Sequence, residues 1–158
     1  MADMFIKIDG IAGESQDAMH PDEIEVLGWH WSVMQQSSMQ SGSGGGAAKA
    51  TVSDLQFTHL IDRASPNLAS HCFQGKHISK VGLTLRKAGG LPLEYLKITM
   101  FDVIVTRVEP TAGSGFVLEH VALSFARMKQ EYIVQSATGG SQGTVTALID
   151  VKQNTVGG

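Results

Sequence analysis

One stretch of the sequence resembles a phosphate-binding loop: the run Gly-Ser-Gly-Gly-Gly-Ala-Ala-Lys-Ala at residues 42–50. A phosphate loop needs Ser or Thr directly after its lysine, and then a helix whose N-terminus faces the anion. Here Ala50 follows Lys49, and the next apolar residues are spaced as in a strand. The run therefore disfavours a nucleotide site. It is typical of a mobile loop, or of an arm that becomes ordered against another subunit.

The histidines and the cysteine form no motif for metal binding or catalysis. No two of the six histidines, at positions 20, 30, 59, 71, 77 and 120, are spaced as His-x-His or His-x-x-x-His. The single cysteine, Cys72, cannot form an internal disulfide, and its place on an apolar stripe favours an inert core thiol. No Gly-x-Ser-x-Gly elbow precedes a helix. We therefore expect neither an enzyme nor a cofactor site.

Composition and charge disfavour several other functions. The 158 residues fit one domain, residues 1–158, and 42% of them are hydrophobic, which is enough for a sizeable core. A net charge of -3, from fifteen acidic and twelve basic residues, gives no attraction for nucleic acid. No segment approaches the roughly 20 apolar residues of a membrane span. Charged residues interrupt the N-terminus, so we expect no signal peptide and a cytoplasmic protein, unless a machine exports it.

Alternating apolar and polar residues predict strands over much of the chain. Further strands are expected at residues 5–9 and 23–33, separated by a polar stretch at 10–22. After Met100 the apolar residues change parity, which predicts a bulge there or burial on both faces. The alternating apolar positions are Val81, Leu83 and Leu85; Leu96, Ile98 and Met100; Phe101, Val103 and Val105; Val121, Leu123 and Phe125; and Val145, Ala147, Ile149 and Val151.

One segment predicts a helix. Ser65 suits the N-cap, Pro66 the first helical position and Gly75 the position just past the end. Many strands with one short helix favour an antiparallel barrel or sandwich, with the helix at one opening. The expected apolar stripe of the helix consists of Leu68, Ala69, Cys72 and Phe73.

The sequence Trp29-His30-Trp31-Ser32 combines bulky and polar residues at alternating positions. In a strand the two indoles share one face, with Leu27 and Val33, and are expected to fill the core. His30 and Ser32 then share the other face with Gly28. That face could border a wet cavity, a channel or plain solvent, and alternation does not choose among them.

The longest segment without strand or helix signals covers residues 35–48. It is rich in Gly and Ser, too flexible to pack and too long for a hairpin turn. A loop of this length usually has a function or is disordered.

A series of short motifs runs in order through nearly the whole chain, and in combination it resembles the haemolysin-coregulated protein (Hcp) family of type VI secretion systems. The motifs are Met4-Phe5-Ile6-Lys7-Ile8; Gly13-Glu14-Ser15; Ile24-Glu25-Val26-Leu27-Gly28-Trp29 followed by Trp31; Phe57; Ile61-Asp62; Ser65-Pro66-Asn67-Leu68; Cys72; Gly75-Lys76-His77; Leu83-Thr84-Leu85-Arg86-Lys87-Ala88-Gly89-Gly90; Glu94-Tyr95-Leu96; and Leu123-Ser124-Phe125-Ala126.

This resemblance implies a mainly β fold, an antiparallel β-barrel with one short flanking α-helix, related to phage tail-tube proteins. It implies that six copies form a ring, and that rings stack into a tube which a contractile sheath expels from a Gram-negative cell. The family carries no catalytic activity, and its own machine exports it without a signal peptide. The implied partners are other copies of the chain, a spike protein, the sheath and small effector proteins.

Two sites are predicted. The resemblance places the strand of Trp29 on the inner wall of the ring, so His30 and Ser32 are predicted to line the channel. His30 departs from the smaller residue that is common at this position in the family. The loop at 35–48 is predicted to reach across the stack of rings, through Gly42, Ser43, Gly44, Gly45 and Gly46.

A second hypothesis from another class is a small-ligand-binding β-barrel, in which Trp29 and Trp31 form an apolar pocket. Composition does not separate the two hypotheses. Oligomeric state does, because a ligand pocket needs no ring.

Overall fold

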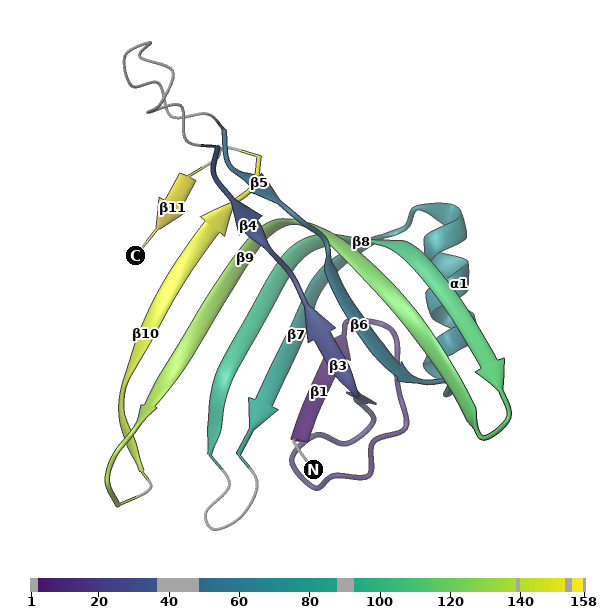
Figure 1. Cartoon of the computed structure of the whole chain (residues 1–158), viewed down its shortest axis with the longest axis horizontal. Helices are drawn as coiled ribbons and strands as arrows, with labels where there is room; N and C mark the ends of the chain where they lie inside the picture. The colour runs from purple at the N-terminus through teal and green to yellow at the C-terminus, as the bar shows by residue number, and fades with distance from the viewer. Residues whose placement is uncertain (1–2, 37–48, 88–92, 139, 153–154, 158) are drawn as a thin grey trace.

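The computed structural model describes residues 3–36, 49–87, 93–138, 140–152 and 155–157, the last three as backbone only. This part of the chain confirms a mainly β, antiparallel fold with one flanking helix (Figure 1). No helix within it is long and apolar enough to cross a membrane. The elements are β1 (Asp3–Ile8), β2 (Ile24–Glu25), β3 (Gly28–His30), β4 (Val33–Met34), β5 (Thr51–Val52), β6 (Leu55–Leu60), α1 (Ala64–Gln74), β7 (His77–Arg86), β8 (Glu94–Gly113), β9 (Phe116–Gln135), β10 (Ser141–Asp150) and β11 (Thr155–Gly157).

Backbone pairing closes these strands into a barrel. Antiparallel ladders run from β1 through β7, β8, β9 and β6 to β3. β2 pairs with the free side of β1. The N–H of Val26 donates to the carbonyl of Met4 (2.9 Å), and the N–H of Leu27 donates to the carbonyl of Thr58 (2.8 Å). The chain thus moves from β1 to β6 between two consecutive residues, and this step closes the ring of strands.

The prediction of a single strand at 23–33 is wrong, because the backbone changes partner within this segment. The structure has three short strands there, β2, β3 and β4, each with a different partner strand. A strand cannot keep its alternation while its backbone changes partner, so the segment breaks at residues 26–27 and again at 31–32.

The predicted alternation holds in the barrel wall, where the inward side chains form a continuous core. The change of parity after Met100 is present, and Asp102 has a φ of 55°, in the left-handed region. The pairing register does not shift there, because β7 and β9 change parity at the same level. It is therefore a kink shared by three strands rather than a bulge in one. The buried residues on either side of the kink are Ile78 and Val81 in β7, Met100 and Val103 in β8, and Phe125 and Met128 in β9.

The helix differs from its prediction at its start but not at its end. It begins at Ala64, and the carboxylate of Asp62 accepts the N–H of Ala64 (2.8 Å), so the expected N-cap at Ser65 is wrong. Ser65 is buried instead, and its Oγ accepts the N–H of Asp62 (3.1 Å). Gly75 ends the helix with a φ of 61°, as predicted.

The predicted apolar stripe is wrong at two positions: Phe73 is 93% exposed, and Ala69 is also exposed. The face that enters the core consists of Ala64, Ser65 and Leu68. In the last helical turn Phe73 therefore faces away from the core, whereas Cys72 packs against it.

Candidate assembly surfaces and a polar sheet face

His30 lies in β3 with its side chain exposed, and the ladders place other polar residues beside it. His30 pairs with Gln56 of β6, which pairs with Ala122 of β9, which pairs with Arg107 of β8. The neighbouring rung on the same side joins Gly28, Thr58, His120 and Glu109. We call this surface the polar face; it consists of Gly28, His30, Gln56, Thr58, Arg107, Glu109 and His120.

One contact between β6 and β9 and one within β8 hold the polar face in place. Thr58 Oγ1 and His120 Nδ1 are 2.9 Å apart, and Arg107 donates to Glu109 across 2.6 Å. The hydrogen bond and positive charge of Arg107 lower the pKa of Glu109. The face is therefore a shallow hydrophilic surface with no large apolar side chain among its members.

Ser32 is exposed but lies outside these rungs, in the link between β3 and β4. Its N–H donates to Ser53 Oγ (2.8 Å), and its carbonyl accepts the N–H of Ser53 (2.9 Å). The structure thus places His30 within the polar face and Ser32 just beyond it.

The tryptophans pack against the core and are half-buried. Leu27 and Val33, expected on their face, are instead 54% and 51% exposed. This follows from the broken strand, since Leu27 lies where the chain changes partner and Val33 opens β4. A surface pocket of about 230 Å³ is lined by Leu27, Leu60 and other residues, but by neither tryptophan.

The core-facing side of the sheet continues past the barrel onto the second half of β9 and onto β10. Met128, paired with Ile149, is buried in the core. Four residues further along β9 on the same side, Tyr132 is paired with Val145, and these two are 45% and 65% exposed. We call the surface of Tyr132 and Val145 the uncovered sheet face.

β10 also presents backbone groups along its outer edge. Within the described residues, β11 pairs only with the last three residues of β10, from Leu148 to Asp150. Residues 141–147 of β10 have β9 on one side and no described strand on the other. Such an edge is a template for pairing with another chain.

His59 and Glu119 form a buried pair inside the barrel. His59 is fully buried and Glu119 is 3% exposed, with 2.8 Å between Nε2 and Oε1. His59 Nδ1 lies 3.8 Å from the Asp62 carboxylate, which is an ionic distance rather than a hydrogen bond. Burial alone would lower the pKa of His59, but the two carboxylates outweigh burial and raise it. The pair therefore favours the charged imidazolium.

The sequence does contain a signal for this pair, although our predictions missed it. His59 has the parity of Leu55 and Phe57 in β6, and Glu119 has the parity of Val121 in β9. A histidine and a carboxylate on the buried parity of two strands are expected to need a partner.

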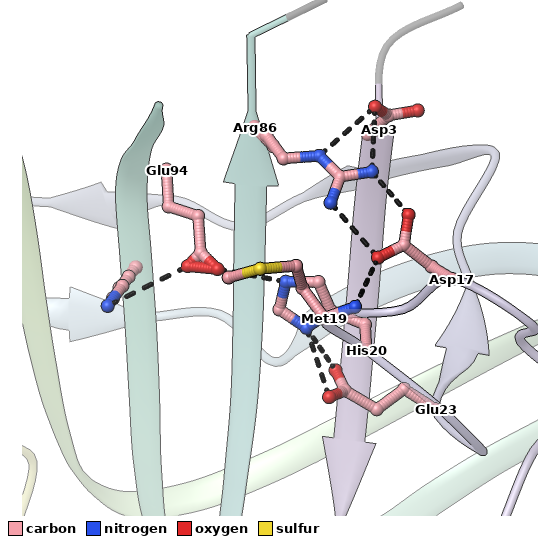
Figure 2. A network of polar contacts seen from close by, with 8 residues as sticks. Asp3, Asp17, Met19, His20, Glu23, Arg86 and Glu94 are labelled. Carbon is pink, nitrogen blue, oxygen red and sulfur yellow. Dashed lines mark hydrogen bonds and ion pairs between the residues drawn. The ribbon is translucent and has the colours of Figure 1, made fainter. Parts of the chain in front are cut away.

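A second ionic network fastens the segment before β2 to the sheet (Figure 2). Arg86 of β7 binds the carboxylate of Asp3 (3.0 Å) and both carboxylate oxygens of Asp17. Its hydrogen bond to Asp17 raises the pKa of Arg86 and holds the pKa of the Asp17 carboxyl well below its usual range. Asp17 also accepts the N–H of Met19 (2.9 Å).

His20 joins the same segment to two further strands. Its Nδ1 is 3.0 Å from Glu23 and its Nε2 is 3.0 Å from Glu94 of β8, while its ring stacks on Phe5 at 4.5 Å. These contacts brace the segment against β1, β7 and β8. They fasten this segment to the barrel wall (Figure 2).

Other predicted positions have simpler outcomes. Gly42, Ser43, Gly44, Gly45 and Gly46 lie outside the described residues. Cys72 is half-buried against the core. Across the described ranges, no group of three or more His, Cys, Asp or Glu side chains is arranged to hold a metal ion.

Comparison with known proteins identifies the family. The family model for the type VI secretion system effector Hcp matches residues 5–132. The chain belongs to the Hcp family. It is 48% identical to the protein hcp1 of Pseudomonas aeruginosa over 145 residues, 89% of each chain.

Solved Hcp structures are similar over nearly the whole chain. Hcp1 of Salmonella typhimurium is 49% identical, covers 99% of both chains and has a TM-score of 0.81. A type VI secretion system effector of Yersinia pestis is 47% identical, with a TM-score of 0.79, over 94% of this chain and 100% of its own.

Family membership confirms the function predicted from the sequence. The chain is a subunit of the type VI secretion tube. The Hcp family is one of structural tube proteins rather than of enzymes, and membership implies self-assembly, partners within the machine and secretion from a Gram-negative cell.

Proposed function

We propose that six copies of this Hcp chain close into a ring, and that each copy covers the uncovered sheet face of its neighbour. The observation that carries this proposal is the exposure of Tyr132 and Val145 on the core-facing side of the sheet. Apolar area gains roughly 25 cal/mol per Å² when it leaves water. A contact between two different surfaces, repeated around a closing rotation, makes a ring. The free edge of β10 can add backbone hydrogen bonds to the same contact.

The polar face then forms the inner wall of the ring, with His30 within it and Ser32 at its border. A channel that passes different effector proteins should be hydrophilic and shallow, because deep apolar pockets would retain them. The members of the polar face meet this requirement. The channel passes effectors without a catalytic step or a cofactor.

Rings stack into the tube through the segment that contains Gly42, Ser43, Gly44, Gly45 and Gly46. β4 and β5 pair on either side of it, so its two ends leave the barrel together. A spike protein caps the tube and the sheath surrounds it. The chain is made in the cytoplasm and is exported by the machine without a cleaved signal peptide.

Native mass tests the ring directly. Six copies of 16.8 kDa amount to 100.8 kDa, which light scattering on the purified protein is expected to find. A mass of 16.8 kDa across micromolar concentrations would contradict the ring and favour the ligand-binding barrel.

A further inference from the structure

Charge is segregated between two segments of the chain. Residues 9–25 contain Asp9, Glu14, Asp17, Asp22, Glu23 and Glu25 but no Lys or Arg, whereas residues 63–87 contain Arg63, Lys76, Lys80, Arg86 and Lys87 but no Asp or Glu. Part of this charge is neutralised within the chain, since Arg86 binds Asp17 and Arg63 binds Asp22. Within the described residues, Glu25, Lys76 and Lys80 belong to no ion pair.

The acidic segment borders a pocket with apolar walls. Leu27, Leu60 and Ile61 line it and are 54%, 57% and 39% exposed. We call it the acidic pocket; it is completed by Glu14, Ser15, Glu25 and Asp62. Its volume of about 230 Å³ is below the roughly 300–1,000 Å³ of small-ligand pockets. It therefore suits a single apolar side chain better than a separate ligand.

The start of α1 fixes two carboxylates of the acidic pocket. Glu14 accepts the N–H of Arg63 (3.1 Å), and Asp62 accepts the N–H of Ala64 (2.8 Å). Two cations lie close by, but His59 is buried and, of the pocket carboxylates, lies beside Asp62 alone, and the guanidinium of Arg63 is held by Asp22 and by the carbonyl of Gly13. The pocket therefore retains negative charge beside its apolar walls.

The other end of α1 carries the matching groups. Phe73 in the last helical turn is 93% exposed, and Lys76 and His77 follow it, also exposed. We call these three residues the basic knob. A single exposed apolar residue is ordinary on a protein surface. Here, however, the exposed aromatic ring adjoins unpaired positive charge, while an acidic apolar pocket lies elsewhere on the chain.

The two surfaces cannot meet within one molecule. The acidic pocket lies at the start of α1 and the basic knob at its end, and a helix of 11 residues is about 16 Å long (Figure 1). A contact between them must join two copies. Because it joins two different surfaces, it is head-to-tail and repeats along an assembly.

We propose that the basic knob of one copy enters the acidic pocket of the next, with Phe73 between Leu27 and Leu60 and with Lys76 and His77 facing Glu25. This contact rests on the proposed self-assembly and names one pair of surfaces that produces it. The buried aromatic ring supplies the anchor, and the charges around the pocket set the orientation and speed the association.

Removal of the aromatic ring and reversal of the charges test the contact between the basic knob and the acidic pocket. Phe73→Ser should raise the concentration needed for assembly about 30-fold or more, as loss of a buried aromatic anchor does. Lys76→Glu should weaken assembly less, and adding Glu25→Lys to it should restore assembly. Lys7→Glu is the matched control, because Lys7 is exposed on β1 and belongs to neither surface. Light scattering over a dilution series measures all four.

Cross-linking tests the contact without removing its apolar part. Lys76→Cys and Glu25→Cys in one chain, with Cys72→Ala to remove the native thiol, should give a ladder of joined copies with a short thiol cross-linker. The ladder should be absent with either cysteine alone and with Lys7→Cys in place of Lys76→Cys.

The outcomes separate this contact from the proposed ring. A monomeric wild type overturns both. A wild type that assembles, is unaffected by Phe73→Ser and gives no ladder overturns this contact alone. Cross-links from the pocket cysteine to an effector, rather than to another copy, overturn it as well.

Discussion

The two halves of β9 both alternate, with a change of parity between them, but they have different surroundings. In the first half, which pairs with β6, Val121 and Leu123 are 1% and 0% exposed. In the second half, which pairs with β10, Tyr132 is 45% exposed although it faces the same side as the core. The strand pattern is thus complete in both halves, and only the barrel half is covered by its own chain. An apolar face that one chain builds and does not cover is expected to be covered by another chain.

The largest expected effect is in the barrel half. Phe57 is 1% exposed and packs among the core side chains, so Phe57→Ala should cost about 3–5 kcal/mol of folding free energy through lost burial and a residual cavity. Urea unfolding measures it. A loss below about 1 kcal/mol would mean that the barrel core is not the main source of stability.

A substitution in the half of β9 and β10 that lies outside the barrel should affect assembly and leave folding nearly unchanged. Val145→Asp introduces a charge on the uncovered sheet face, where solvent still reaches it in the single chain, so the folding free energy should change by about 0.5 kcal/mol or less. The ring, however, should dissociate, because the charge would be buried without a partner. Lys7→Glu is the control, since Lys7 is exposed on β1 and belongs neither to the uncovered sheet face nor to the free edge of β10. Rings that survive Val145→Asp would remove this face from the interface.

The same contrast explains what the sequence could predict. Strands and core positions such as Leu83 and Leu123 follow from alternation, which is a local property of the chain. The closure of the barrel does not, because the change of partner between Val26 and Leu27 depends on carbonyls of distant strands. Whether a side chain such as Val145 is covered depends on which elements lie above it, and alternation contains no information about that.

The helix and the polar face show the same limit. Ser65 and Asp62 are both good capping residues. Asp62 accepts the N–H of Ala64 because of how the helix packs on the barrel, which the local sequence does not contain. The sequence placed His30 opposite the tryptophans. It could not show that His120 and Arg107, from strands far along the chain, would complete the surface around it.

The buried pair in the barrel should make stability depend on pH. The native pKa of His59 is raised above 6.5, so the native state binds more protons than the unfolded state as pH passes between these two values. The stabilisation is therefore complete below about pH 6.5 and is lost as pH rises through the native pKa. Urea unfolding of the Val145→Asp monomer between about pH 6 and 9 avoids linkage to assembly.

His59→Gln should flatten this part of the pH profile, whereas His77→Gln, at an exposed histidine, should leave it unchanged. A profile that rises with pH in the wild type would contradict a charged His59. The barrel half would then owe its stability to apolar packing without the His59–Glu119 pair.

The smallest expected effect on folding and assembly is at the polar face. His30 is exposed in β3 and contacts neither the core nor the uncovered sheet face, so His30→Arg should leave unfolding and native mass unchanged. In the proposed ring it would, however, add six guanidinium groups to the channel wall beside Arg107. A narrower channel with a more positive wall should retain fewer effector molecules, which co-purification with a cognate effector measures.

Gln56→Arg, on the same rung as His30, should also reduce effector retention. Lys7→Arg, which leaves the charge of β1 unchanged, is the control. Unchanged retention by intact His30→Arg rings would place the polar face outside the channel, and loss of the ring would place His30 at a subunit contact instead.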